Sequence, residues 1–177
     1  MDKNDRRKPV LYAFSGLPGA GKSTLSLALA RRIVAVYLRI DTIEQALRDL
    51  CNIEVETEGY EFAHRISGDN LRLGLDVVAD SCNPVESSRL AWEKIATDSG
   101  ADCLNIEILC SDRREHRRRI ENRPATVPGL KVLAWDEVES RHYEPWTRNR
   151  LVIDTAGKSE NESIEMLFHL LKISPPR

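Results

Sequence analysis

The chain has 177 residues, a formal net charge of −2, 41% hydrophobic residues and 31% charged residues. This composition is typical of a globular protein and predicts one domain over residues 1–177 with a sizeable core. The acidic balance argues against a general nucleic-acid-binding surface, and no apolar run is long enough to cross a membrane. The four cysteines show no C-x-x-C spacing, which argues against zinc and favours reduced thiols in a cytoplasmic protein.

The order of apolar segments predicts an α/β fold with a mostly parallel sheet, because five short apolar runs alternate with longer amphipathic stretches. The strands are expected at 10–15, 35–39, 75–79, 103–110 and 151–154. The helices are expected at 22–34, 42–50, 59–71, 85–99, 113–122, 136–143 and 160–171. Residues 1–8 are charged, no apolar signal-peptide core follows them, and they are expected to form a loose tail. Asn83 is expected to cap the helix at 85–99, with Pro84 in its first turn.

The most informative motif lies between the first expected strand and the first expected helix. Its residues fit the P-loop pattern G-x-x-x-x-G-K-[ST]: Gly16, Leu17, Pro18, Gly19, Ala20, Gly21, Lys22, Ser23 and Thr24. Backbone N–H groups of such a loop bind phosphate oxygens, and the following helix N-terminus adds positive potential. Lys22 is expected at the β- and γ-phosphates and the Ser23 hydroxyl on Mg²⁺. The motif therefore predicts ATP and Mg²⁺ as cofactors.

Two aspartates follow expected strands, where ligands bind in open α/β sheets. Asp41 is positioned to orient an acceptor hydroxyl and take its proton as a catalytic group. The alternative is that it only caps the helix at 42–50. Asp80 ends the third apolar run and is expected to act on Mg²⁺, with a solvated strand end as its alternative.

Arginines crowd the segment 113–123, and a loop with two prolines and a glycine follows it at 123–133. This loop is expected to be a mobile lid. Arg119 and Arg123 are expected near the nucleotide, with Arg123 acting on the transferring phosphoryl group. The other arginines, and in the alternative all of them, belong to a solvated basic face.

Several other residues resemble sites but have simpler interpretations. Residues 154–157 mimic a GTPase switch, yet no N-K-x-D element is present to read guanine, so they are interpreted as a strand end and turn. The four histidines lack metal-ligand spacing, and the three tryptophans are interpreted as core or loop anchors. Specificity for the acceptor is expected in 51–75, which carries Tyr60, His64, Arg65, Asp69 and Arg72.

Taken together, these motifs resemble the P-loop small-molecule kinases of the AAA-33 and zeta-toxin-like branch, similar to chloramphenicol phosphotransferase and the polynucleotide kinase domain. The resemblance rests on 16–24, 39–43, 77–83, 89–92, 116–123 and 143–146. It implies a three-layer P-loop NTPase fold with a five-stranded parallel sheet in the order 2-3-1-4-5 and a small lid. It also implies that Asp41 activates the acceptor and that Arg119 and Arg123 contact ATP. The chain departs from polynucleotide and adenylylsulfate kinases at Glu44, where those enzymes have arginine.

The function expected from these features is ATP- and Mg²⁺-dependent transfer of the γ-phosphoryl group to a hydroxyl of a small molecule. Two alternatives stay open. One is a polynucleotide 5′-hydroxyl kinase, which would need a basic channel for a strand. The other is an ATP-binding regulatory switch with no acceptor. The identity of the acceptor and the oligomeric state are not determined by the sequence.

Overall fold

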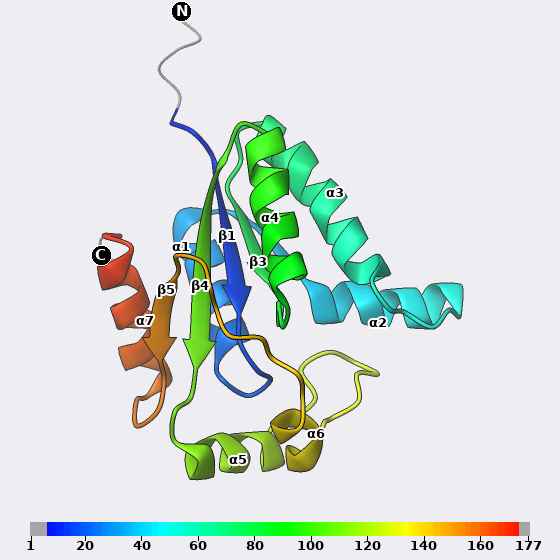
Figure 1. Ribbon diagram of the computed structural model, residues 1–177, viewed down its shortest axis with the longest axis vertical. Helices are drawn as coiled ribbons and strands as arrows, with labels where there is room; N and C mark the ends of the chain where they lie inside the picture. Colours follow the sequence, from blue (N-terminus) through cyan, green and yellow to red (C-terminus); the bar gives the residue numbers. More distant parts are fainter. Residues whose placement is uncertain (1–6, 174–177) are drawn as a thin grey trace, which may run out of the picture.

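A five-stranded sheet forms the centre of the computed structural model, which describes residues 7–173 (Figure 1). Its strands are β1 (Val10–Ser15), β2 (Val36–Arg39), β3 (Val77–Asp80), β4 (Asp102–Leu109) and β5 (Leu151–Asp154). They lie in the order β2-β3-β1-β4-β5, and every pairing is parallel. The topology expected from the sequence is thereby confirmed.

Helices cover both faces of the sheet and make it the middle of three layers (Figure 1). Helices α1 (Lys22–Ile33) and α7 (Glu160–Leu170) pack on one face, while α3 (Glu58–Arg72) and α4 (Glu86–Asp98) pack on the other. Successive β1 side chains alternate between these faces, as the pleat requires. Phe14 joins the cluster under α1 and α7, whereas Leu11 and Ala13 join the cluster under α3 and α4.

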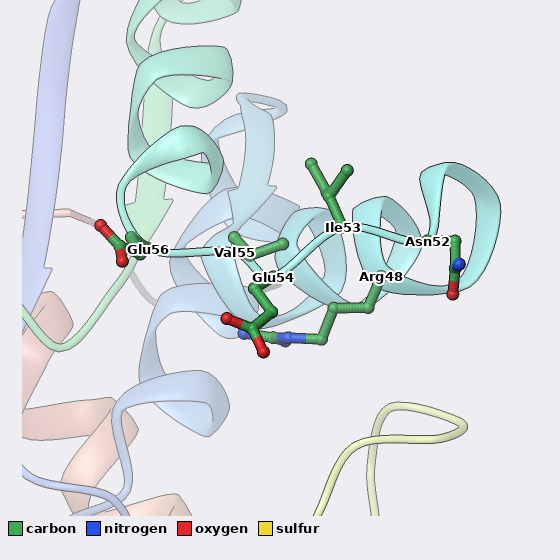
Figure 2. Close-up of a pocket in the computed structure, with 6 residues that line it drawn as sticks. All are labelled: Arg48, Asn52, Ile53, Glu54, Val55 and Glu56. Atoms are coloured by element: carbon green, nitrogen blue, oxygen red, sulfur yellow. The ribbon is translucent and has the colours of Figure 1, made fainter.

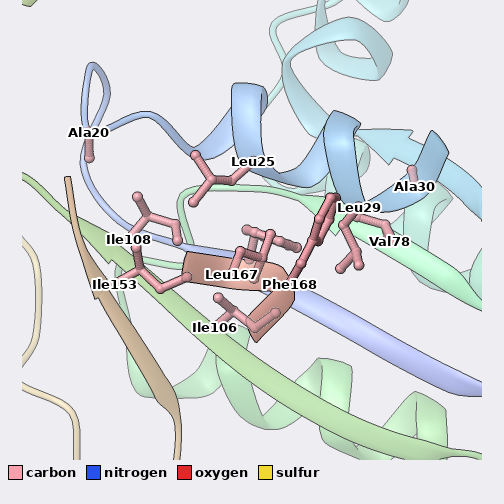
Figure 3. Close-up of a cluster of buried hydrophobic side chains, with 11 residues drawn as sticks. Ala20, Leu25, Leu29, Ala30, Val78, Ile106, Ile108, Ile153, Leu167 and Phe168 are labelled. Carbon is pink, nitrogen blue, oxygen red and sulfur yellow. The ribbon is translucent and has the colours of Figure 1, made fainter. Parts of the chain in front are cut away.

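The buried cluster beneath α1 and α7 anchors the helix that follows the P-loop (Figure 3). Leu25 and Leu29 of α1 meet Ile106 and Ile153 from the strands, and Leu167 of α7 closes the cluster. All five side chains are at most 1% exposed. Because burial of each such side chain contributes about 2 kcal/mol, the start of α1 is held firmly against the sheet.

The carboxyl ends of the strands share one edge, and helices α2, α5 and α6 lie beside it (Figure 1). Helix α2 (Ile40–Cys51) follows β2 directly, and α5 (Arg113–Glu121) follows β4 after a short turn. The expected lid loop connects α5 to α6 (Trp135–Glu139) and has no helix or strand of its own. This edge is where a parallel sheet places a ligand.

The expectation that Asn83 caps α4 is wrong, because Asn83 has another role. Its φ is 45°, its amide donates to the carbonyl of Phe14 (2.9 Å), and its amide oxygen accepts from Trp92 (2.9 Å). The helix begins at Glu86, whose backbone N–H donates to the carboxylate of Glu144 at 2.6 Å. A partner 58 residues away therefore caps α4.

Two helix boundaries differ from the sequence-based expectation by two residues or more. Helix α2 begins at Ile40, so Asp41 lies in its first turn and is not its N-cap. Helix α6 ends at Glu139, short of the expected 143. Arg89 fixes the chain after α6 by donating to the carbonyls of Glu144 (2.8 Å) and Pro145 (3.2 Å). Pro145 also disfavours helical angles at the residue before it.

Most of the expected N-terminal tail lies outside the described residues. Its described part forms ion pairs with the folded chain: Arg7 pairs with Asp76, and the Lys8 ammonium lies 3.7 Å from the carboxylate of Asp102. Between residues 7 and 173, no helix has both the length and the apolar content needed to cross a bilayer.

Candidate functional site

The P-loop takes up backbone angles that only glycine adopts without strain. Gly16, Gly19 and Gly21 have φ values of 131°, 82° and 102°. The N–H of Gly16 donates to the carbonyl of Cys82 (3.1 Å), which ties the loop to the chain after β3. Lys22 is 8% exposed, and its ammonium donates to the carbonyl of Leu17 (3.1 Å). The loop therefore curls around the side chain expected to meet phosphate.

Gly16→Ala is expected to destabilise the protein by about 2 kcal/mol or more, because the new Cβ would lie 2.0 Å from the backbone oxygen of Ile108. Gly100→Ala is the matched control, since Gly100 also has positive φ (69°) but has no atom within 4 Å of the added Cβ. Urea unfolding of both variants gives the comparison. Equal losses of unfolding free energy would mean that the contact with β4 does not matter.

A cleft of about 1280 Å³ opens at the carboxyl edge of the sheet. It brings together sequence-predicted site residues from four separate segments: Lys22, Ser23, Thr24, Asp41, Asp80, Arg119 and Arg123. Pro18, Gly19 and Gly21 of the P-loop also line it. Basic side chains outnumber acidic ones in the lining although the whole chain is acidic. The cleft is thus suited to an anionic ligand.

Arg39 links the two aspartates and was not predicted as a site residue. Its guanidinium lies 3.6 Å from the carboxylate of Asp41 and 3.8 Å from that of Asp80. It also donates to the hydroxyl of Thr126 in the lid loop at 2.8 Å. The signal in the sequence was its place at the end of an apolar strand, two residues before Asp41.

Asp80 is 4% exposed, whereas the Asp41 side chain is 42% exposed. The Tyr37 hydroxyl donates to Asp80 at 2.8 Å. Burial, together with the charge of Asp80, raises the pKa of Tyr37, so that hydroxyl keeps its proton. Asp41 is left open to a ligand, while Asp80 is held at the base of the cleft.

The side of α2 that faces the cleft presents further polar groups to it. Glu44, Gln45 and Arg48 line it together with Asp41. Burial raises the pKa of Glu44, which accepts from Arg48 at 3.2 Å. A Cβ at Gly59 would lie 2.3 Å from the Glu44 side chain, so α3 begins in close contact with it. Glu44 is therefore held in the wall of the cleft.

Arg119 and Arg123 have different surroundings although both line the cleft. Arg119 pairs with Glu115 (2.7 Å) and donates to the Thr155 hydroxyl (2.7 Å), which in turn donates to the P-loop carbonyl of Ala20 (2.9 Å). Arg123 forms no ion pair within the described part of the chain. Thus Arg119 is fixed to the P-loop, while Arg123 keeps its charge available.

His116 joins α5 to the P-loop. Its Nε2 lies 2.7 Å from the carbonyl oxygen of Pro18, so Nε2 carries the proton and donates. The ring meets Trp135 of α6 edge-on, with centroids 5.3 Å apart. Leu17 of the P-loop packs on the same small cluster as Trp135. Both helices flanking the lid loop therefore rest on the P-loop.

The residues expected to read the acceptor from 51–75 do not line this cleft. Tyr60 and His64 turn inward, and the His64 ring meets Trp92 with centroids 4.3 Å apart. Arg72 pairs with Asp69 on the surface (2.8 Å). Arg48, which also lines the cleft, forms part of a separate shallow pocket of about 560 Å³ between α2 and α3 (Figure 2).

The groups that line the cleft are suited to bind ATP with Mg²⁺. The glycine cradle leaves room for phosphate beside the N-terminus of α1, which adds positive potential. The Ser23 hydroxyl and the Asp80 carboxylate are hard oxygen ligands lining the same cleft. Residues 7–173 hold no cluster of three or more histidines, cysteines, aspartates or glutamates that could bind a metal alone. Mg²⁺ is commonly held by few protein oxygens together with phosphates and water.

Solved structures, among them an APS kinase and a gluconokinase, share this fold. APS kinase CysC from Mycobacterium tuberculosis, in complex with AMPPNP and APS, is 20% identical with a TM-score of 0.65, covering 94% of this chain and 99% of its own. A gluconokinase from Sinorhizobium meliloti 1021 is 15% identical with a TM-score of 0.67, covering 94% of each chain. A structure from Chloroflexus aurantiacus J-10-fl is 20% identical with a TM-score of 0.72, covering 94% and 97%.

Comparison at the sequence level gives the family. No curated protein matches the sequence significantly. The model of the AAA_33 family, described as an AAA domain, matches residues 11–145. That range contains the P-loop, Asp41, Asp80 and the lid, and it covers more than half of the chain. The chain belongs to the AAA_33 family of P-loop proteins.

Proposed function

We propose that this protein is a kinase that transfers the γ-phosphoryl group of ATP, with Mg²⁺, to a hydroxyl of a small molecule in the cytoplasm. The observation that carries the proposal is the cleft itself, which places Asp41 in one lining with Lys22 and Ser23. A nucleotide-binding switch needs the P-loop, but it does not need a half-exposed carboxylate at the point of transfer. The fold shared with APS kinase and a gluconokinase supports the same reaction class.

The P-loop residues bind and orient the phosphates in this mechanism. Backbone N–H groups and Lys22 hold the β- and γ-phosphates, and Ser23 and Asp80 would hold Mg²⁺, which neutralises phosphate charge when bound. Asp41 accepts the proton of the acceptor hydroxyl and directs its oxygen toward phosphorus. Arg123 adds positive charge where negative charge develops. Closure of the lid loop excludes water from the reacting groups.

The acceptor contacts are assigned to α2, with Glu44 and Gln45 as hydrogen-bonding groups beside Asp41. Carboxylate and amide oxygens at this spacing on one helix face suit neighbouring hydroxyl groups of a polar acceptor.

A transfer assay with γ-labelled ATP tests the function. The purified chain is incubated with Mg²⁺ and separate pools of sugars, polyols, nucleosides and hydroxylated antibiotics, together with a 5′-hydroxyl oligonucleotide. Label transferred to one small molecule is the expected result. Label on the oligonucleotide would identify a polynucleotide kinase. Slow hydrolysis that no acceptor accelerates would favour the regulatory switch.

Arg123→Ala is expected to lower the transfer rate by about 10²-fold while weakening ATP binding far less, because its charge acts mainly in the transition state. Arg114→Ala is the control, since Arg114 is exposed on α5 and lies outside the cleft lining. Steady-state kinetics and calorimetric ATP titration provide both quantities. Equal losses of rate and affinity would instead mean ground-state binding by Arg123.

A further inference from the structure

Within the described cleft lining, Arg39 is the only side chain with polar contacts to Asp41, to Asp80 and to the lid loop. Its side chain is 13% exposed, so it is largely removed from water at the junction of β2 and α2. A guanidinium has a rigid fork of donors, which lets one residue address several acceptors at once. Its position therefore joins two parts of the site that are distant in sequence.

The three polar contacts of Arg39 differ in length. The bond to the Thr126 hydroxyl is short, at 2.8 Å, whereas the carboxylates of Asp41 and Asp80 lie at 3.6 and 3.8 Å, beyond ordinary hydrogen-bond distance. The Nε–H of Arg39 is buried and has no hydrogen-bond partner. A buried donor without a partner is costly, so a small movement of Arg39 toward the carboxylates would be favourable.

The same movement would draw the lid inward, because Thr126 is hydrogen-bonded to the guanidinium. The lid also carries Arg123, whose charge has no ion-pair partner in the described chain and which lines the cleft. Bound nucleotide phosphates would attract Arg123 and so favour the closed arrangement over the open one.

We propose that Arg39 is a positioning residue that couples lid closure to the placement of Asp41, and this rests on the proposed function. Arg39 holds the acceptor-orienting carboxylate and Thr126 in one network. When nucleotide draws the lid inward, Asp41 is fixed at the same step. Hydrolysis of ATP by water is thereby limited, since Asp41 and the lid reach their working positions together.

Trypsin cleavage of the lid loop tests the coupling without knowledge of the acceptor. Lys131 in the loop is 74% exposed at its side chain, and the bond after it is a cleavage site that mass spectrometry identifies. AMPPNP with Mg²⁺ is the probe. Protection is measured as the cleavage rate without nucleotide divided by the cleavage rate with it. Wild type is expected to be protected about tenfold, the change that one charged hydrogen bond provides.

Arg39→Met and Thr126→Val are each expected to remove most of this protection, and the double variant should lose no more than either single one. Thr126→Ser keeps the hydroxyl and is expected to show the protection of wild type. Arg39→Lys should not restore the protection, because one ammonium cannot reach Asp41, Asp80 and Thr126 together. Arg65→Met is the control, since Arg65 is exposed on α3 and outside the cleft lining.

The outcomes separate this proposal from the proposed function. A purely structural Arg39 would lower thermal stability and speed cleavage equally with and without nucleotide, and that unchanged ratio would overturn the proposal. Full protection in Thr126→Val would overturn it as well, even if Arg39→Met failed to fold. AMPPNP binding to wild type without protection would overturn the coupling but leave ATP binding intact. Absence of AMPPNP binding would remove the proposed function and the coupling with it.

Discussion

Lys22→Ala is expected to reduce phosphoryl transfer by about 10³-fold and to weaken ATP binding by about 10- to 100-fold. The ammonium lies inside the P-loop, where it donates to the carbonyl of Leu17 and is 8% exposed. In this water-poor position a charge-assisted bond to phosphate is stronger than at the surface. Part of that charge acts on the transferring group, so the rate falls further than the affinity.

Lys94→Ala is the matched control for Lys22→Ala. Lys94 pairs with Asp98 on the exposed side of α4 and lies outside the cleft lining. Calorimetric titration with ATP and Mg²⁺ gives the affinity, and thermal unfolding shows whether each variant is folded. A folded Lys22→Ala protein with unchanged affinity and rate would remove the kinase hypothesis, because the P-loop would then bind no nucleotide in the expected way.

The parts of this site that sequence analysis found are those specified by neighbouring residues. The P-loop is a contiguous motif, and its glycines show where positive φ values are needed. Strand order followed from the resemblance, and the alternating apolar runs gave the elements. Asp41 and Asp80 were singled out because they follow strands, and both line the cleft. Local pattern and fold thus predict which edge carries the site.

The parts that the sequence did not predict depend on partners far away along the chain. Asn83 is a residue type that often caps helices, yet its amide donates to the carbonyl of Phe14. The carboxylate of Glu144 caps α4 instead. In the sequence Arg39 looks like an ordinary strand residue. Its hydrogen bond to Thr126, 87 residues away, forms only in the folded chain. Acceptor contacts were expected in 51–75, but α2 lines the cleft instead, because Tyr60 and His64 of α3 pack against Trp92 and not into the cleft.

Asp41→Asn is expected to lower transfer to the acceptor by about 10²–10⁴-fold, the range for losing a positioned general base, with ATP affinity nearly unchanged. In the proposed mechanism the P-loop supplies most phosphate contacts, and Asp41 lines the same cleft from α2. Because Asp41 is in the first turn of α2 and is not its N-cap, the substitution costs the charge–dipole interaction and the partly exposed pairing with Arg39, together about 1 kcal/mol. The variant should therefore fold normally.

Asp69→Asn is the control for Asp41→Asn, since Asp69 is exposed on α3, pairs with Arg72 (2.8 Å) and is outside the cleft lining. The three quantities to measure are thermal stability, ATP affinity and the rate of transfer to the acceptor found in the γ-label assay. A transfer rate equal to wild type would exclude Asp41 as the base. Loss of ATP–Mg²⁺ affinity in step with the rate, partly restored by high Mg²⁺, would make Asp41 a metal-binding residue instead. A rate loss that Mg²⁺ does not restore, with affinity intact, is the result that the exposed carboxylate beside Arg39 predicts.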